Sequence, residues 1–522
     1  MEWSIGHSIY KRAIFTPDKA AVIYEDKPIS YKELNDNVNR TANYLLDKGI
    51  KKGDRITALF LNCPEFLEVY FAAAKIGAIF VPINFRLVGP EIEYQLNNCE
   101  SCMFIFHDLF VPAIDPIRSN VMVDRDKYIY VKGLNPGGPE CPEWAQDYSE
   151  VVANYSTEEP NVVEDVDLDD PLAIIYTSGT TGDPKGAVVS HLQTFFKNIQ
   201  IMMYMDMNSK DIFLAQLPLF HSGGLFVVAT PVLWRGATMI LRYTFDPGQF
   251  ATDIEKHRPT CILALTTMWR FILDSGKLDK IDVSSVRHVG GGGEATPQTL
   301  LDELAKRGLY VQQGFGQTEN SAMMMVPKEM MQKKQGSIGL PGFCTEVWVA
   351  DDEFNKLPPG KVGRIVCKGP TRMIGYWKMP EKTKEAIKGN ILDTGDLGYT
   401  DEDGFFYMVD RAKDMYRSGG ENVYPAEIEK ILAAHPKITN AVIIGVPDDK
   451  WGETGKVFVL PAKEGETITL DEIHTFLEGK AARYKFPKIL EMLTELPMTA
   501  TGKIRKTVLK EKEKAKKSRE NK

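Results

Sequence analysis

The stretch that decides the fold is IIYTSGTTGDPKGAVVSH, residues 174–191, in which an apolar run leads into Thr, Ser and Gly. Its glycines permit positive φ angles and close backbone approach. Exposed N–H groups in such a loop form an anion-binding nest, and the hydroxyl groups and Lys185 add donors. It is not a Walker A loop, because Gly186 stands where that motif needs Ser or Thr. The stretch predicts a strand and a different phosphate-binding loop, although alone it is also typical of a mobile surface loop.

Strands and helices alternate on both sides of this stretch. Apolar runs predict strands at 20–24, 54–61, 172–178, 260–265 and 286–294. Amphipathic segments predict helices at 30–49, beginning at Ser30 and ending at Gly49, and at 64–77. This alternation predicts an α/β fold with a mainly parallel sheet. Ligands of such sheets gather at the carboxyl ends of strands, where the Gly-rich and hydroxyl-rich loops fall.

The C-terminal part of the chain has a different pattern of predicted secondary structure. Segments after about residue 345 are β-rich, and a compact α/β unit of about 100 residues follows VDRAKD, residues 409–414. We therefore expect a large α/β domain of several subdomains at 1–410, a hinge at 411–414 and a small mobile α+β domain at 415–508. The charged run at 509–522 predicts a disordered tail.

Composition narrows the function classes. A chain of 522 residues is too long for one core, and 43% hydrophobic with 26% charged residues is typical of a globular protein. The net charge of −8 argues against a nucleic-acid partner. Seven scattered cysteines indicate a reducing, cytoplasmic setting, and the pair Cys99 and Cys102 lacks a second pair at zinc-ligand spacing. No apolar stretch is long enough to cross a bilayer, while peripheral membrane contact and the oligomeric state stay open.

Further segments carry groups suited to a nucleotide or to an acid. Four glycines in VGGGGEA, residues 289–295, leave bare backbone against which a nucleobase can lie. Asp396 in DTGDLG offers a carboxylate suited to the hydroxyls of a ribose. Each residue also has a structural explanation when taken alone: lysines such as Lys503 are mostly solvated, a histidine such as His221 often sits in a core, and Glu319 or Asp396 could cap a turn. The remaining segments are LPLFHSGGL (217–225), GFGQTE (314–319), VDRAKDMYRSGGENVYPAEIE (409–429) and PMTATGKIRK (497–506).

In this order and spacing, the motifs closely resemble those of the adenylate-forming superfamily, over residues from about 10 to 506. That superfamily includes acyl- and aryl-CoA synthetases, firefly luciferase and the adenylation domains of peptide synthetases. The resemblance implies an AMP-forming acid–thiol ligase that uses ATP, Mg²⁺ and coenzyme A. It also implies that carboxylate attack on the α-phosphorus depends mainly on positioning and charge stabilisation.

The resemblance also implies a role for each matching residue. The β- and γ-phosphates of ATP would be held by Thr177, Ser178, Gly179, Thr180, Thr181, Gly182 and Lys185. Adenine would be framed by Gly292, Gly293, Glu294 and Phe315, and the ribose by Asp396 and Arg411. Catalytic contacts would come from Thr318 at the α-phosphate, Glu319 at Mg²⁺, Lys503 between carboxylate and α-phosphate, and His221 as a gate of the acyl pocket. Lys413 would be the hinge, and the CoA channel would be lined by Ser418, Gly419 and Gly420.

The acid itself is less well defined. The candidate pocket lining is apolar and supplies no buried charge for an ammonium or a second carboxylate: Phe220, Val227, Ala322, Met323 and Met324. Methionines suit a flexible chain, but they are equally typical of a core. Peptide-synthetase domains carry an aspartate where this chain has His221, so an amino acid is not expected. We expect a medium- or long-chain fatty acid; the alternatives are an aryl or cinnamic-type acid, a carnitine-type acid, or an inactive acyl-binding relative.

Overall fold

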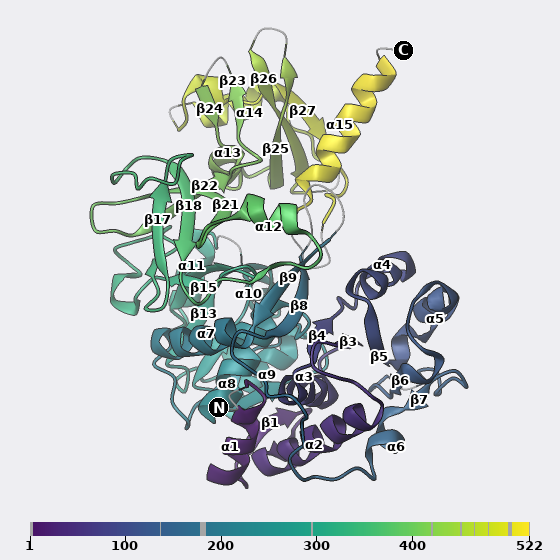
Figure 1. Cartoon of the computed structure of the whole chain (residues 1–522). Coiled ribbons are helices and arrows are strands. Elements are labelled where there is room, and N and C mark those ends of the chain that lie inside the picture. Colours follow the sequence, from purple (N-terminus) through teal and green to yellow (C-terminus); the bar gives the residue numbers. More distant parts are fainter. Residues whose placement is uncertain are drawn as a thin grey trace. The chain divides into compact units, whose positions relative to one another are not determined.

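The computed structural model describes residues 4–135, 137–177, 184–293, 296–418, 421–448, 451–463, 465–478, 480–498 and 504–520. These residues form two compact units (Figure 1). Unit 1 comprises the chain up to Thr177 together with Pro184–Glu346 and Cys367–Leu392. Unit 2 comprises Val347–Val366 and the chain from Asp393 onward. The predicted hinge at 411–414 lies inside unit 2 and remains a prediction.

The opening stretch lies in an eight-stranded sheet of unit 1. Its strands β8 and β9 are antiparallel neighbours, in the register that places Thr177 opposite Lys185. Parallel pairing of β4 with β8 continues the sheet toward β7. In order, the strands are β19 (Gly375–Tyr376), β9 (Lys185–Ser190), β8 (Pro171–Thr177), β4 (Ile79–Pro82), β3 (Arg55–Leu59), β5 (Ser101–His107), β6 (Tyr128–Val131) and β7 (Gln146–Asp147).

A second sheet of unit 1 has nine strands and is also mainly parallel. Its central strands β11, β10, β12, β13 and β14 are parallel, and β15, β16 and β2 run antiparallel to their neighbours. The α/β class predicted from the alternation is thereby confirmed. In order, the strands are β16 (Leu340–Pro341), β15 (Ser321–Met325), β14 (Val311–Gln317), β13 (His288–Gly291), β12 (Cys261–Leu263), β10 (Ile212–Leu214), β11 (Thr238–Leu241), β1 (Ala20–Tyr24) and β2 (Lys27–Ser30).

The helices of unit 1 begin and end where their sequences indicate. Helix α2 is capped by Ser30, whose Oγ accepts a hydrogen bond from the N–H of Glu33 at 3.0 Å. Helix α3 ends at Gly77, which adopts the left-handed conformation with φ +74°. The helices are α1 (His7–Phe15), α2 (Tyr31–Asp47), α3 (Pro64–Ile76), α4 (Gly89–Cys99), α5 (Val111–Ile114), α6 (Tyr148–Val152), α7 (His191–Tyr204), α8 (Thr230–Arg235), α9 (Pro247–His257), α10 (Thr266–Asp274), α11 (Gln298–Ala305) and α12 (Pro380–Ala386), with a π-helix η4 (Gly223–Ala229) before α8.

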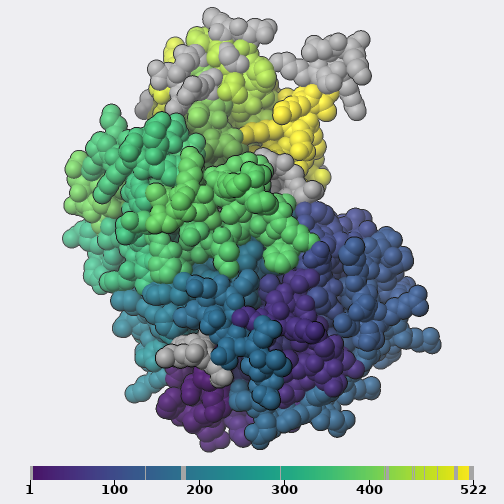
Figure 2. Space-filling view, viewed as in Figure 1, coloured from purple at the N-terminus to yellow at the C-terminus, as the bar shows by residue number. Residues whose placement is uncertain are grey.

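One contiguous hydrophobic core joins both sheets of unit 1. It includes residues of α2, α3, β3, β8, η4 and β10 to β14. Polar contacts hold the segment 157–159 against helices α2 and α3. Lys75 pairs with Glu159 at 2.6 Å, and the side-chain amide of Asn39 donates to the carbonyl of Thr157 at 2.7 Å. In Figure 2 the purple N-terminal segment borders blue residues of the same unit. The site elements of unit 1 are therefore held by a shared core.

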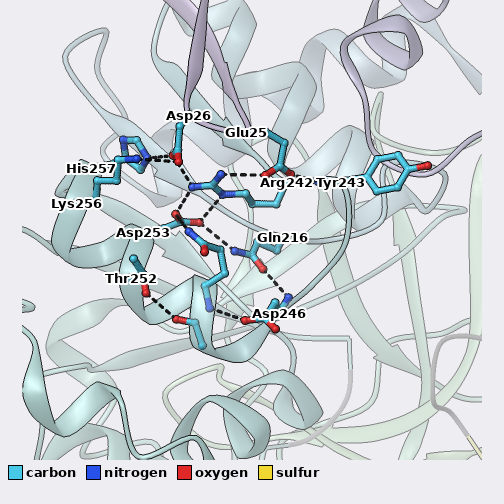
Figure 3. Close-up of polar contacts among 12 residues, drawn as sticks. Glu25, Asp26, Gln216, Arg242, Tyr243, Asp246, Thr252, Asp253, Lys256 and His257 are labelled. Carbon is cyan, nitrogen blue, oxygen red and sulfur yellow. Dashed lines mark hydrogen bonds and ion pairs between the residues drawn. The ribbon is translucent and has the colours of Figure 1, made fainter. Parts of the chain in front are cut away.

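An ion-pair network centred on Arg242 lies near the β1–β2 edge of the nine-stranded sheet (Figure 3). Arg242, just after β11, pairs with Asp253 of α9, and also with Asp26 at 2.7 Å and Glu25 at 3.1 Å. Arg242 is 4% exposed at its side chain and Asp253 is fully buried. The hydrogen bond to Asp253 raises the pKa of Arg242. The hydrogen bond from Lys256, followed by that from Arg242, lowers the pKa of Asp26. The network joins the β1–β2 turn to α9 through one guanidinium.

Unit 2 holds most of a five-stranded sheet and all of another. The first comprises β17 (Glu346–Ala350), β18 (Gly363–Lys368), β21 (Ile391–Thr400), β20 (Ile387–Lys388) and β22 (Phe406–Arg411). The second comprises β24 (Glu421–Val423), β23 (Tyr416–Ser418), β26 (Gly452–Pro461), β25 (Ile438–Asp448) and β27 (Ile489–Met492). Helices α13 (Pro425–Leu432) and α14 (Leu470–Leu477) share its core through Ile428, Leu432, Ile473 and Leu477.

The structure differs from the disordered tail expected at 509–522. Helix α15 extends over Lys506–Glu520. Its first turns are anchored, because Leu509 is 1% exposed in a core with Val442 and Ile444 of β25. The charged residues that suggested disorder are mainly Lys and Glu, which are good helix formers once one end is fixed. None of the helices in the described ranges has the length and apolar character needed to span a membrane.

We predict that His107 makes the stability of unit 1 depend on pH. His107 is 1% exposed, and its Nδ1 accepts the N–H of Leu61 at 3.1 Å. Burial lowers its pKa to about 3, whereas an unfolded histidine titrates near pH 6.5. As the pH falls below about 6.5, the unfolded state takes up the proton first, so the free energy of unfolding decreases. By urea unfolding, we expect a loss of about 1–2 kcal/mol from this group between about pH 7 and pH 5.

The variant His107→Asn tests this assignment, because an amide oxygen can still accept the Leu61 hydrogen bond but does not titrate. We expect its unfolding free energy to fall less steeply than that of the wild type over the same pH range. Identical slopes for the two proteins would show that His107 is not responsible.

Candidate functional site

Strands β8 and β9 hold the ends of the predicted phosphate loop. Thr177 Oγ1 donates to the carbonyl of Lys185 at 3.3 Å, which fixes the base of the hairpin. Lys185 Nζ lies 5.0 Å from the centre of the Tyr376 ring. The loop residues between them, Ser178, Gly179, Thr180, Thr181 and Gly182, lie outside the described residues. Their phosphate-binding role therefore remains a prediction.

Tyr376 connects this hairpin to Glu319. Tyr376 lies in β19, which pairs with β9 opposite Ala187, and its hydroxyl donates to Glu319 Oε1 at 3.0 Å. The backbone of Glu319 is also held, because its carbonyl accepts the N–H of Met373 at 2.7 Å. A carboxylate anchored in this way fits the hard-oxygen preference of Mg²⁺. Tyr376 was not predicted from the sequence, although the aromatic hydroxyl in IGYW, residues 374–377, was an available signal.

The glycine run after β13 allows close approach of two strands. A Cβ atom at Gly292 would lie 2.8 Å from the carbonyl oxygen of Gly314 in β14, so a side chain there would clash. Gly293 has φ +83°, a conformation that favours glycine. Phe315 lies on β14 opposite Met324 of β15. The adenine-binding role of these residues remains a prediction, and Glu294 lies outside the described residues.

Thr318 and His221 lie at the start of the π-helix. Thr318 Oγ1 donates to the hydroxyl of Ser222 at 3.0 Å, which places the 314–319 motif against the residue that follows His221. His221 Nδ1 accepts the N–H of Gly223 at 3.2 Å, and its carbonyl accepts the N–H of Leu225 at 3.0 Å. Two motifs about 100 residues apart in the sequence are thus brought together, as the shared site requires.

In unit 2, Asp396 and Arg411 are direct partners. They face each other across the antiparallel strands β21 and β22, with Arg411 Nε 2.7 Å from Asp396 Oδ1. Asp396 is fully buried, whereas the Arg411 side chain is 47% exposed. Lys413 is exposed, and its carbonyl accepts a hydrogen bond at 3.0 Å from Lys510 of α15. Ser418 is buried in β23, while Gly419, Gly420 and Lys503 lie outside the described residues.

The residues predicted to line the acid pocket are mostly buried. Met323 and Met324 are fully buried, and Phe220 is 6% exposed with its ring 5.2 Å from that of Phe85. Val227 is half-buried in η4. The fifth candidate, Ala322, lies in β15, where its side chain is not described. These burials fit a pocket lining and a core equally well.

A buried lysine lies near this region, outside the five residues predicted to line the pocket. Lys197, on helix α7, is fully buried, and its Nζ lies 3.6 Å from the centre of the Phe226 ring in η4. Burial lowers its pKa well below the usual range for lysine. The pocket predicted from the sequence was limited to residues 220–228, the glycines at 290–293 and the stretch after Glu319. The missed signal was the polar spacing of HLQTFFKNIQ, in which polar residues recur at 193, 197 and 200 on one helical face.

Elsewhere in unit 1, Asp26, Asp253 and His257 are close enough to share a cation. Arg242 and Lys256 already contact these carboxylates, so the group is an ion-pair network rather than a metal centre. Cys99 ends α4, and Cys102 is a half-buried residue of β5. Neither group adds to the site formed by the nucleotide motifs.

Comparison with known proteins places these features in a family. The model of the AMP-binding enzyme family matches residues 10–377, and the model of the AMP-binding enzyme C-terminal domain matches residues 427–503. A feruloyl-CoA synthase from an Amycolatopsis species is 35% identical over 503 residues, which cover 96% of this chain and 97% of the relative.

Two solved structures show the same fold. An o-succinylbenzoate CoA synthetase from Bacillus subtilis, in complex with its acyl-adenylate intermediate, is 29% identical with a TM-score of 0.85, covering 96% of this chain and 97% of the other. A fatty acyl CoA synthetase of Mycobacterium tuberculosis is 31% identical with a TM-score of 0.77, covering 98% and 99%.

We predict that Tyr376→Phe weakens the binding of Mg²⁺ together with nucleotide. The variant keeps the ring beside Lys185 but removes the hydroxyl that donates to Glu319. We expect the Mg²⁺ concentration for half-maximal thermal stabilisation by ATP to rise about fivefold, which corresponds to about 1 kcal/mol. A thermal shift titration measures it.

The matched control is Tyr155→Phe, which removes a surface hydroxyl that donates to Asp47 at 2.6 Å. This control should leave the magnesium titration at the wild-type midpoint. A Tyr376→Phe protein with the wild-type midpoint would contradict a role for Tyr376 in positioning Glu319.

Proposed function

This chain belongs to the AMP-binding enzyme family, and we propose from that membership that it activates an aryl or cinnamic-type carboxylic acid. It is an acid–CoA ligase that forms an acyl-AMP and uses ATP, Mg²⁺ and coenzyme A. The observation that carries the proposed site is the assembly of Lys185, Tyr376 and Glu319 beside the ends of β8 and β9. We propose the identity of the acid and the role of each residue as follows.

In the first half-reaction, a carboxylate oxygen attacks the α-phosphorus of ATP, and the bond from that phosphorus to pyrophosphate breaks. We assign Lys185 and the hydroxyl-rich loop to the departing phosphates, and Thr318 to the α-phosphate. Glu319, oriented by Tyr376, would hold Mg²⁺, which supplies positive charge to the phosphates when bound. Lys503 would bridge the carboxylate and the α-phosphate. Asp396 would accept the ribose hydroxyls, with its carboxylate oriented by Arg411.

In the second half-reaction, the sulfur of coenzyme A attacks the acyl carbonyl carbon, and AMP leaves. The same arrangement cannot serve both steps, because in the first step Lys503 would lie beside the reacting carboxyl group, where coenzyme A must approach in the second. We propose that a turn about Lys413 withdraws Lys503 and brings Ser418, Gly419 and Gly420 to line the pantetheine channel. A hinge of a few residues between rigid bodies is a common way to separate two steps.

The feruloyl-CoA synthase at 35% identity supports an aryl or cinnamic-type acid. The fatty acid expected from the sequence remains the second candidate, supported by the apolar Met323 and Met324 and by the fatty acyl CoA synthetase structure. A carnitine-type acid is disfavoured, because the buried Lys197 would repel a quaternary ammonium.

We predict that ATP–pyrophosphate exchange is fastest with an aryl acid. A panel of cinnamic, indolic, benzoic, medium-chain and long-chain acids should show exchange that is at least about tenfold faster with an aryl acid than with any fatty acid. Preference for a fatty acid would favour the second candidate. No exchange with any acid would overturn the proposed activity.

We predict that Lys503→Ala separates the two half-reactions. The variant should lose adenylation by at least about a hundredfold, since a charge that acts at the transition state is removed. It should retain thioester formation from a supplied acyl-adenylate and coenzyme A, measured by release of AMP. Equal loss in both half-reactions would contradict the two-state assignment.

A further inference from the structure

Helix α7 carries three buried polar side chains that lack partners. Thr194, Lys197 and Asn198 are all fully buried. In the described part of the chain, hydrogen-bond partners are absent for Thr194 Oγ1, for Lys197 Nζ and for both amide atoms of Asn198. Buried polar groups in folded proteins are nearly always paired. Three adjacent unpaired residues on one helix therefore indicate a group that the protein itself does not supply.

Other polar residues of α7 are bonded to the protein through at least one atom, although Gln193 Oε1 has no partner among the described residues. Gln193 Nε2 donates to the carbonyl of Thr318 at 3.4 Å, and the Tyr204 hydroxyl donates to the carbonyl of Met323 at 3.1 Å. Gln200 Oε1 accepts the N–H of Cys344 at 2.9 Å. This stripe fastens α7 to β15 and to the turn after β16. Thr194 and Asn198 lie on the adjoining face of α7, whereas Lys197 lies on the same face as Gln193 and Gln200 and reaches the Phe226 ring of η4.

Lys197 has the strongest requirement for a partner. The Phe226 ring at 3.6 Å offsets part of the cost of burying an ammonium. No carboxylate of the described chain pairs with it, and burial alone lowers its pKa. Removing an unpaired ammonium from water costs several kcal/mol, which an anionic or strongly accepting oxygen would offset.

We propose that Lys197, with Thr194 and Asn198, binds a second oxygen-bearing group of the acid, remote from the carboxylate that is activated. This inference rests on the proposed function, since it takes the acid to lie along η4 and β15. Gln193 contacts Thr318, which we assign to the α-phosphate, and Lys197 is one turn further, about 6 Å along the helix axis. That spacing suits a substituent on the far side of a ring or chain.

The chemistry of the three side chains selects the substituent. A lysine ammonium donates only, whereas Asn198 and Thr194 can donate and accept. A carboxylate or a phenolic hydroxyl uses all of these groups, and a cationic or purely apolar group leaves Lys197 unpaired. The substrate class is therefore an acid with a distal carboxylate or hydroxyl oxygen.

The test compares acids in matched pairs by ATP–pyrophosphate exchange. The hydroxyl arm pairs 4-hydroxycinnamate with cinnamate, and the carboxylate arm pairs 4-carboxycinnamate with cinnamate. Two alkyl pairs, nonanedioate with nonanoate and 9-hydroxynonanoate with nonanoate, probe the same contact on a chain. We expect kcat/KM to be at least about tenfold higher for the oxygenated member in one arm. No preference for an oxygenated member in any pair would overturn the inference.

The variant Lys197→Met keeps the length of the side chain and removes the charge. We expect the ratio of kcat/KM within the preferred pair to collapse to about one, and Lys197→Gln, which keeps a donor, to give an intermediate ratio. Lys210→Met removes an exposed lysine after α7 and should keep the wild-type ratio. An unchanged ratio in Lys197→Met would overturn the inference.

Thermal melting without acid separates recognition from folding. Because Lys197 is unpaired, Lys197→Met should melt at or above the wild-type temperature. A much lower melting temperature together with equal loss for both acids of a pair would assign Lys197 to the fold and overturn the inference. Preference confined to the alkyl pairs would refute the proposed aryl substrate while supporting the role of Lys197. Exchange with aryl acids but without a preference for the oxygenated member of a pair would support the proposed aryl substrate and overturn the role of Lys197.

Discussion

The hydrogen bond from Tyr376 to Glu319 is the constraint on which the arrangement of unit 1 at the site depends. Tyr376 belongs to the eight-stranded sheet through β19 and β9, and Glu319 follows β14 of the nine-stranded sheet. The N–H of Met373 binds the carbonyl of Glu319 beside it. Two contacts from one short segment thus couple the two sheets. The spacing between the phosphate hairpin and the acidic residue is set by this segment rather than by either sheet alone.

Helix α7 has a second organising role, because its buried polar side chains serve different purposes. Gln193, Gln200 and Tyr204 hold the loop after β14, the turn after β16 and strand β15. Lys197 faces η4 instead. A helix fixed by these bonds can hold a buried lysine without a protein partner, because the core prevents the side chain from turning outward to water.

Much of the fold was predictable because local sequence and tertiary structure agree. The cap at Ser30 and the glycine after α3 mark helix ends by local chemistry. The sequence could assign Asp396 and Arg411 to the same ribose site, but it could not predict that they face each other, because strand register depends on the whole hairpin.

The failures have equally physical causes. A charged run indicates exposure but does not reveal that Leu509 anchors α15 in a core. The Tyr376 contact joins residues 57 positions apart in the sequence, and no periodic pattern records such a contact. Lys197 escaped notice because a lysine is ordinarily solvated, so its burial becomes visible only when α7 is packed.

The π-helix η4 has a consequence for how such an enzyme diversifies. A wide turn contains more residues than an α-helical turn, and such turns are rare and concentrated at functional sites. His221 stands before η4 and the regular helix α8 follows it. A gain or loss of one residue inside Gly223–Ala229 can therefore be absorbed by a change of winding, which re-aims Phe226 and Val227 while both flanks keep their places. Under the proposed function, such a change would alter the acid pocket and leave the nucleotide-binding residues in place.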